Sequence, residues 1–586
     1  MLRRHLIILA YAPAILADTV SYYWELTWVW GAPDGFGRPI IGVNNTWPCP
    51  AIEANVNDTV VINLTNSLGN ETTGIHFHGI DQIDSNGYDG AAGTNQCPIP
   101  PGSTITYSFQ ANDAGSFWCT CYSTPLSHLV ALTVSEKIIH IMMGQYPDGF
   151  RGPLIIRDPS DPYLDQYDDD MTITITDWYH SQTPTLVQQM IVPNNTNFTP
   201  PHPDAILVND GGNGQIAVDA GKTYRFRIMN LSALTAAFVV FASLQMQVIM
   251  VDASYVQKAA ANQLRVSPSQ RCDVLVTIGD SDSQNYPFLV ALDTNEDYTI
   301  VDADPPLAFH LNYTGQLVVD SSGDLNGTTE VDTWYPIDDT TLLPYDNASA
   351  YGPITKQWVM NFDYCFDANG YPRACFNDTT FIDQIVPSLY SVVSLGDNNT
   401  EATAYGQVNP FIVAYGDVVD IVVNNHNTAI HPFHLHGHQF QVIYRPPSNS
   451  SDWTGSETVP ATPMRRDTVS VFPNSHVVLR IVANNPGVYL FHCHIEWHVE
   501  LGLTATLIEA PEKLVDYQIP QDMLDVCNAQ GIPTTGNAAG NADWSDTDGF
   551  ITINPTTYEG AVVATATADS ASTSSTTDSA SATSTG

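Results

Sequence analysis

Short runs in which apolar and polar residues alternate make up most of the chain, and Gly, Pro and Asn separate them. Clear examples are residues 59–64, 104–109, 172–176, 224–228 and 418–423. A period of two is typical of strands that bury one face in an antiparallel sheet. Because few windows carry a helical period, the pattern predicts an all-β protein built from β-sandwiches.

An internal repeat links the two ends of the chain. Residues 50–79 and 410–437 both run from an Ile-x-Ala through an Asp to an Asn eight residues further on, and both end in His-x-His-Gly. A second match joins Gly-Ser-Phe-Trp at 115–118 to Gly-Val-Tyr-Leu at 487–490. The first and last thirds are therefore expected to be copies of one sandwich unit.

The middle third carries a weaker copy of this unit. Residues 221–230 resemble its strand part but lack the histidines. We therefore expect three consecutive sandwich domains, at 18–158, 159–330 and 331–530.

Both ends of the chain differ in composition from these domains. Arg3 and Arg4 precede an apolar run at 6–16 that ends at Ala17, which is the form of a signal peptide at 1–17. The run is shorter than the ~20 residues that a membrane span needs, and no other stretch is long enough. Residues 531–586 form a Ser/Thr-rich tail, and the composition of its last part, 561–586, cannot bury a core. We expect a secreted, extracellular glycoprotein that is a monomer.

The charge balance narrows the possible partners. The chain of 586 residues has 19 Lys and Arg against 62 Asp and Glu, a formal net charge of −43. Nucleic acid and anionic membranes require clustered basic residues, so neither is expected as a partner. Only 14% of the residues are charged while 43% are hydrophobic, which excludes a disordered polyanion.

Histidines are concentrated in three short blocks. These blocks contain His76 and His78, then His431, His434, His436 and His438, and finally His492, His494 and His498. Residues i and i+2 of a strand face the same side, so each His-x-His pair directs two imidazoles at one point. Several such pairs are expected to converge only around a cation, and imidazole together with a thiolate suits copper.

Cys493 makes the copper prediction more specific. It lies between His492 and His494, so on a strand it faces away from both. Its partners are then His431 and His498, which gives the two-His, one-Cys site of a type 1 (blue) copper. Leu503 takes the axial position and cannot ligate, which should raise the reduction potential. A disulfide half or a buried free thiol are the alternatives for this cysteine.

These blocks resemble the copper signatures of the multicopper oxidases. The motifs HFHG, HPFHLHGH and HCHIEWHVELGL occur in the family's order, and the resemblance covers residues of about 20–530. It implies three cupredoxin-like Greek-key domains, the second without copper, and is strongest to fungal laccases and fungal iron-uptake ferroxidases.

The resemblance also implies a ligand set for four coppers. The type 1 ligands would be His431, Cys493 and His498, the type 2 ligands His76 and His434, and the type 3 ligands His78, His436, His492 and His494. In addition, Asp89 and Glu496 match carboxylates that deliver protons during O2 reduction.

One pair of the family's histidines is missing. The family has Tyr-His-Ser-His after Gly-Ser-Phe-Trp, and the internal repeat places histidines five and seven residues after Gly115, where Thr120 and Tyr122 stand. The family pattern resumes only after 24 residues, 119–142, where about five are usual. Our hypothesis is that a translated intron has erased two type 3 ligands, which puts type 3 occupancy in doubt. Substitution by His128 and His140 is an alternative, although their spacing gives no shared strand face.

The remaining cysteines suggest three disulfides. By resemblance to laccases, Cys97 and Cys527 should join the first domain to the end of the third. Cys365 and Cys375 are near neighbours that could close a small loop, and Cys49 and Cys272 then remain as a pair. Such bonds fit the secretory compartment.

The implied reaction is one-electron oxidation of a small reductant near His498 or His431, coupled to four-electron reduction of O2 to water. Fungal ferroxidases offer acids to Fe(II), but Asn427 and Thr199 stand at two of the corresponding places. Asp293 and Asp297 could match a third, or could be ordinary solvated acids.

We therefore expect a phenol-oxidising, laccase-like enzyme. A ferroxidase is one alternative. An inactive or electron-transfer copper protein, caused by the missing pair, is the other.

Overall fold

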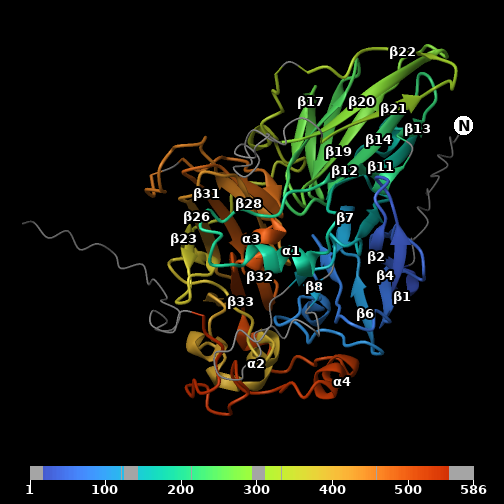
Figure 1. Cartoon of the computed structure of the whole chain (residues 1–586). Coiled ribbons are helices and arrows are strands. Elements are labelled where there is room, and N and C mark those ends of the chain that lie inside the picture. Colours follow the sequence, from blue (N-terminus) through green and yellow to red (C-terminus); the bar gives the residue numbers. More distant parts are fainter. Residues whose placement is uncertain are drawn as a thin grey trace, which may run out of the picture.

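The structure is a computed structural model that describes residues 17–120, 122–123, 143–212, 214–293, 311–331, 333–456 and 458–553. Strands dominate it, and consecutive thirds of the chain each form two facing sheets (Figure 1). The all-β fold class is confirmed. The boundaries at 158 and 330 stay predictions, and the signal peptide lies almost entirely outside the described residues.

The first third forms two four-stranded sheets. One has the order β2-β1-β4-β6, and the other has the order β3-β10-β7-β5. Their bounds are β1 Thr19–Gly31, β2 Arg38–Val43, β4 Thr59–Asn66, β6 Thr104–Gln110, β3 Ile52–Asn55, β10 Gly152–Arg157, β7 Gly115–Thr120 and β5 His76–His78. A separate ribbon pairs β8 (Tyr122–Ser123) with β9 (Met143–Gly144). Along β4 the buried residues Val60, Ile62 and Leu64 alternate with more exposed ones, as the period of two predicts.

The second third repeats this plan with longer sheets. One sheet has the order β12-β11-β14-β19-β16-β17, the other β13-β21-β20-β15-β18, with β22 beside β20. Their bounds are β11 Asp169–Trp178, β12 Ala205–Val208, β13 Gln215–Ala217, β14 Thr223–Asn230, β15 Ala237–Phe241, β16 Met246–Val251, β17 Ser254–Ala261, β18 Leu264–Val266, β19 Arg271–Thr277, β20 Gln284–Leu292, β21 Asn312–Val318 and β22 Asp324–Leu325.

The last third follows the same plan. Its sheets have the orders β24-β23-β26-β31-β28-β29 and β25-β33-β32-β27-β30. The bounds are β23 Lys356–Phe366, β24 Pro372–Phe376, β25 Pro410–Val413, β26 Val418–Asn425, β27 His431–Leu435, β28 Phe440–Tyr444, β29 Arg465–Arg466, β30 Thr468–Val471, β31 Ser475–Val482, β32 Gly487–Cys493 and β33 Thr504–Glu509.

One asparagine marks the repeat in all three units. Asn66, Asn230 and Asn425 each end the equivalent strand, β4, β14 or β26. In every case the side-chain amide donates to two backbone carbonyls and its oxygen accepts from the amide two residues later. Three backbone groups at a buried turn are thereby satisfied, which explains why this residue recurs even in the unit without the histidines.

Helices are short and lie outside the sheets. They are α1 (Thr183–Met190), α2 (Ser388–Ser394), α3 (Glu496–Glu500) and α4 (Gln521–Ala529). No helix within the described ranges is long and apolar enough to cross a membrane. Residues 531–553, assigned above to the tail, instead pack on the third unit, where Ala538 exchanges backbone hydrogen bonds with Ile385, Val386 and Ala404.

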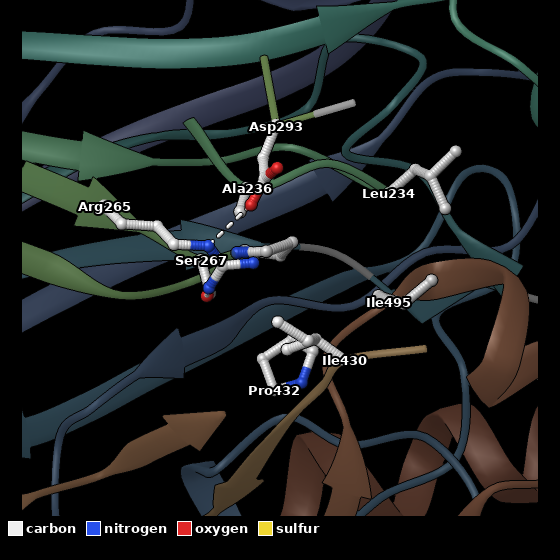
Figure 2. Close-up of a pocket in the computed structure, with 9 residues that line it drawn as sticks. Leu234, Ala236, Arg265, Ser267, Asp293, Ile430, Pro432 and Ile495 are labelled. Atoms are coloured by element: carbon white, nitrogen blue, oxygen red, sulfur yellow. Dashed lines mark hydrogen bonds and ion pairs between the residues drawn. The ribbon is translucent and has the colours of Figure 1, made fainter. Parts of the chain in front are cut away.

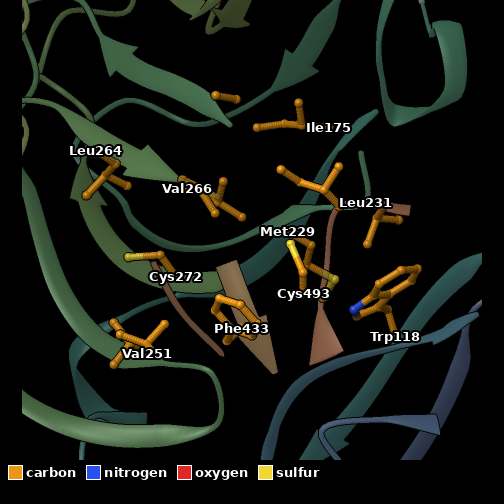
Figure 3. Packing of buried hydrophobic residues seen from close by; sticks show 14 of the residues in the cluster. Trp118, Ile175, Met229, Leu231, Val251, Leu264, Val266, Cys272, Phe433 and Cys493 are labelled. Atoms are coloured by element: carbon orange, nitrogen blue, oxygen red, sulfur yellow. The ribbon is translucent and has the colours of Figure 1, made fainter. Parts of the chain in front are cut away.

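Two of the three expected disulfides are present. Cys97 bonds to Cys527 of α4, and Cys365 bonds to Cys375 across β23 and β24. The Cys49–Cys272 prediction is wrong, because neither residue is in a disulfide. Cys49 lies in the core of the first unit near Gly149, whereas Cys272 lies on β19 in the core of the second, beside residues such as Val251 (Figure 3).

The hydrophobic cores are shared between units. One buried cluster runs through the second and third sandwiches and includes Met229, Leu231, Phe433 and Cys493 (Figure 3). The third unit is therefore packed against the second unit through the strands that carry its histidines and cysteine.

Candidate metal centre

The first group of candidate ligands consists of His431, Cys493 and His498. Sγ of Cys493 lies 3.7 Å from Nδ1 of His431 and 3.4 Å from Nδ1 of His498, and the two nitrogens are 3.1 Å apart. All three residues are buried. Two imidazoles and one sulfur that converge in this way match the donor set of a type 1 copper.

Three different elements supply these residues. His431 opens β27, Cys493 ends β32, and His498 lies on α3 just beyond it. The loop after α3 returns to the site, because Leu503 donates its amide to the His498 carbonyl and accepts from the Cys493 amide. The Leu503 side chain is fully buried and has no donor atom, so an axial ligand from this position is excluded.

Neutral groups cover the outer ring nitrogens of this group. The Tyr364 hydroxyl lies 2.8 Å from Nε2 of His498, and Oδ1 of Asn427 lies 3.2 Å from Nε2 of His431. Phe198 stacks on Tyr364 at 4.4 Å. The sequence does not predict either residue, because Tyr364 reaches His498 from a distant strand of the third unit and Phe198 reaches Tyr364 from the second unit.

The second group gathers six histidines from both ends of the chain. They are His76, His78, His434, His436, His492 and His494, and all are buried. Nε2 of His436 lies 3.2 Å from Nε2 of His492, and the rings of His78 and His434 are 3.8 Å apart. The Nε2 atoms of His78, His434 and His494 are buried without a hydrogen-bond partner. Orphaned ring nitrogens that face one another fit a metal cluster.

Burial lowers the pKa of several histidines of the two groups and keeps them neutral. It lowers the pKa of His78, His492 and His494 well below the ordinary value, and lowers that of His436 and His498 to about 3. Metal ligation requires the neutral ring, so no proton needs to be displaced at neutral pH.

Asp89 holds two of the histidines. Its Oδ2 lies 2.8 Å from Nδ1 of His436, and its backbone oxygen lies 2.8 Å from Nδ1 of His76. Burial alone would raise the pKa of Asp89, but His436 and His76 lower it below its usual range. Such contacts fix each ring with Nε2 directed away from the carboxylate.

Glu496 begins α3, two residues after His494. Its carboxylate accepts the Gly144 amide, and burial raises its pKa to about 7. Burial, and then Glu496, raise the pKa of Glu500 well above the ordinary value. A carboxyl group that can hold a proton near neutral pH therefore lies beside the histidines.

Thr120 occupies the place of one missing histidine. In the third unit His434 pairs with His492 across β27 and β32, and in the first unit His76 pairs with Thr120 across β5 and β7. The Thr120 hydroxyl is buried without a hydrogen-bond partner. Tyr122 follows in β8, whereas His128 and His140 lie outside the described residues.

Asp293 lines a small pocket between the second and third units (Figure 2). It is 1% exposed and pairs with Nε of Arg265 at 2.6 Å, so the solvated-surface interpretation of this acid is wrong. Pro432 and Ile495, each next to a candidate ligand, line the same pocket. Asp297 lies outside the described residues.

Comparison with known families identifies the chain. Family models described as multicopper oxidase match residues 25–127, 169–315 and 381–513, one in each third. The chain belongs to the multicopper oxidases. It is thus a copper-dependent oxidoreductase that uses O2 and a reducing substrate, as members of this family do.

Similar proteins include fungal iron-transport enzymes. The iron transport multicopper oxidase fetC of Epichloe festucae is 40% identical over 90% of this chain and 82% of its own length. The iron transport multicopper oxidase FET3 of Gibberella zeae is 38% identical over 90% of this chain and 82% of its own length.

Solved structures agree in fold. Fet3p, a multicopper oxidase that functions in iron import, matches with a TM-score of 0.83 and 31% identity over 92% of this chain and 99% of its own. A laccase from Botrytis aclada matches with a TM-score of 0.72 and 25% identity, over 88% of this chain and 92% of its own.

The donor sets fit copper unequally. The His431, Cys493 and His498 group is complete for a mononuclear site, and His76 with His434 offers a second pair. The six-histidine group lacks one ligand on the β7 side, because Thr120 stands where a histidine is expected.

Proposed function

We propose that this protein is a ferroxidase, which takes electrons from Fe(II) and transfers them to O2. The observation that carries this proposal is the 40% identity to an iron transport multicopper oxidase over 90% of the chain. Among the solved structures, Fet3p is 31% identical with a TM-score of 0.83, against 25% and 0.72 for the laccase. The laccase-type interpretation is supported only as far as the general family.

Electrostatics supports a cationic substrate. The formal net charge of −43 produces a negative potential that raises the local concentration of cations and has no such effect on a neutral phenol. Asp293 near the mononuclear group is buried and paired with Arg265, so the acids at the protein surface, not this carboxylate, attract the cation.

The chain's own residues take distinct roles in this scheme. Copper supplies one-electron redox chemistry at the mononuclear group and O2 reduction at the cluster. His498 and His431 form the edge at which the reductant meets the protein, and Cys493 joins that edge through the backbone to His492 and His494. Asp89 orients His76 and His436, while Glu496 holds a proton beside the cluster.

A full complement of four coppers would be one type 1, one type 2 and two type 3 ions. We infer that this chain as written holds the first two and binds the type 3 pair poorly, because Thr120 and Tyr122 replace two ligands. Sequencing the spliced transcript tests the intron hypothesis, and recovery of all 24 codons of residues 119–142 would overturn it.

Phenol oxidation is the second candidate. Asn427, Tyr364 and the stacked Phe198 give the mononuclear edge a neutral, partly aromatic lining, which suits an uncharged aromatic reductant.

Secretion remains a prediction, supported by two disulfides that persist in oxidising compartments.

Anaerobic bleaching of the blue absorption separates the two substrates. The copper-loaded protein is mixed without O2 with Fe(II) or with a diphenol, and the rate of bleaching is followed. This step bypasses the cluster, so the missing ligands do not affect it. We expect Fe(II) to react at least tenfold faster at equal concentration; a faster reaction with the diphenol would refute the ferroxidase proposal.

A further inference from the structure

Arg271 of the copper-free second unit contacts all three units. It begins β19 and is 1% exposed. Its Nε donates to the carbonyl of Ser116 in the first unit at 2.7 Å, and Nη1 donates to the carbonyl of Ser269 in its own unit. In the third unit, Nη1 and Nη2 donate to the two carboxylate oxygens of Asp467 at 2.7 and 2.6 Å.

Asp467 connects this guanidinium to a histidine of the cluster. Its backbone oxygen lies 2.9 Å from Nδ1 of His434, and its Oδ1 also accepts from Thr468, whose hydroxyl lies 3.2 Å from the same nitrogen. Every polar neighbour of His434 Nδ1 is therefore fixed directly or indirectly by Asp467, and the orphaned Nε2 is left to face the cluster.

The guanidinium also packs against the HFHG motif of the first unit. Nη1 lies 3.4 Å from Nδ1 of His78. Gly79 has a positive φ of 88°, and a Cβ there would lie 2.6 Å from Nη2 of Arg271 and 2.9 Å from Oδ2 of Asp467. The glycine of this motif is thus needed because the ion pair lies against its Cα.

Asp467 is itself close enough to compete for a metal. His78, His434 and Asp467 offer ligand atoms that all lie within 4.8 Å of one another. The bidentate pairing engages both carboxylate oxygens and neutralises their charge, and a second buried pair, Arg466 with Asp252, lies beside it. A carboxylate held in this way is not free to turn toward the histidines.

We propose that Arg271 is a positioning residue of the histidine cluster, which orients His434 by fixing Asp467 and keeps that carboxylate out of the metal's ligand set. The inference rests on the copper assignment of the proposed function. It gives the unit without ligands a defined part in the cluster's geometry.

Arg271→Lys is the decisive variant. Lysine keeps the positive charge, but one ammonium cannot hold both carboxylate oxygens and the Ser116 carbonyl at the same time. We expect the non-blue Cu(II) signal in electron paramagnetic resonance to change its hyperfine splitting, and copper affinity at that site to fall about 10- to 100-fold. The blue absorption should be unchanged, because Arg271 has no contact with His431, Cys493 or His498 among its hydrogen bonds.

Arg225→Lys is the matched control. Arg225 of β14 is equally buried in the second unit and pairs with the carboxylates of Asp161 and Asp273. Its hydrogen bonds go to these acids and to Met250, so the same substitution should destabilise the unit without altering either copper signal. Should Arg271→Lys not fold, Arg271→Met with Asp467→Leu removes both charges and takes its place in the comparison.

The outcomes separate the positioning role of Arg271 from the copper assignment on which it rests. A folded Arg271 variant with the wild-type non-blue signal and copper content would overturn the positioning role alone. A change of equal size in Arg225→Lys would overturn it as well, since the effect would then be general. A wild-type protein that binds copper but gives no non-blue signal would overturn the copper assignment itself.

Discussion

Asn427 is the residue at which a charge would bear most directly on the choice of substrate. Its Oδ1 lies 3.2 Å from Nε2 of His431 and also accepts the Ala429 amide. Asn427→Asp keeps Oδ1 as the acceptor of both contacts and adds a negative charge at the electron-entry edge. At this range a carboxylate attracts a divalent cation by about 1–2 kcal/mol in high dielectric, so Fe(II) should bleach the blue absorption about tenfold faster.

The control for this prediction carries the same charge elsewhere. Asn361→Asp changes an exposed residue of β23 that bonds to Asn424 rather than to a histidine. We expect less than a twofold effect on Fe(II) and no effect of either variant on a neutral diphenol. An equal gain in both variants would mean that only the overall charge matters.

A second residue, Glu71, should make stability depend on pH. Burial raises its pKa from the ordinary 4.5 to about 7, although Gln145 donates a hydrogen bond to it. Between these pH values the folded protein binds a proton that the unfolded chain has released, so stability falls as pH rises through this window. The loss, complete above pH 7, is on the order of 3 kcal/mol.

Glu71→Gln should remove this loss while keeping an acceptor for Gln145. The thermal midpoint of the variant should exceed that of the wild type by several degrees at about pH 8 and match it at about pH 4. Glu53→Gln, at an exposed acid, serves as control and should shift neither midpoint. A Glu71→Gln midpoint that follows the wild type across the range would contradict the prediction.

At the scale of elements, most of the site could be predicted from the sequence. A strand's period of two is local, so it fixed His431, His434 and Cys493 on their faces before any contact was known. The internal repeat supplied the equivalence of β5 with β27, and the structure pairs Thr120 where His492 pairs in the other copy. The roles of these residues as ligands remain predictions.

The pairing of Thr120 with His76, at the place where His492 pairs with His434, leads to a prediction for β7 and β8. Thr120→His with Tyr122→His restores histidines at the two positions where the third unit has His492 and His494. We expect the bound copper to rise from about two ions toward four, and O2 uptake with Fe(II) to rise at least tenfold. Metal analysis and an oxygen electrode measure both quantities, with Thr120→His alone as control, since it restores only one ligand.

For the whole molecule, the sequence was a poorer guide. Arg271, Asp467 and Phe198 act through contacts between units, and no periodicity within one unit encodes how it packs on another. The Cys49–Cys272 error has the same origin, since elimination among cysteines ignores that the two lie in different cores. The shared core that joins Phe433 to Met229 likewise depends on the assembled chain.

The two disulfides act at this scale, and they should differ in their effect on stability. Cys97–Cys527 closes a loop with a sequence separation of 430, whereas Cys365–Cys375 closes one of 10. A cross-link stabilises mainly by restricting the unfolded chain, which gives about 6 kcal/mol for the long loop and roughly 3 kcal/mol for the short one. Cys97→Ser with Cys527→Ser should therefore lower the denaturation midpoint about twice as far as Cys365→Ser with Cys375→Ser. Both double variants should keep the blue absorption, because neither pair belongs to the group of His431, Cys493 and His498. An equal loss of stability in the two double variants would contradict the loop-length argument.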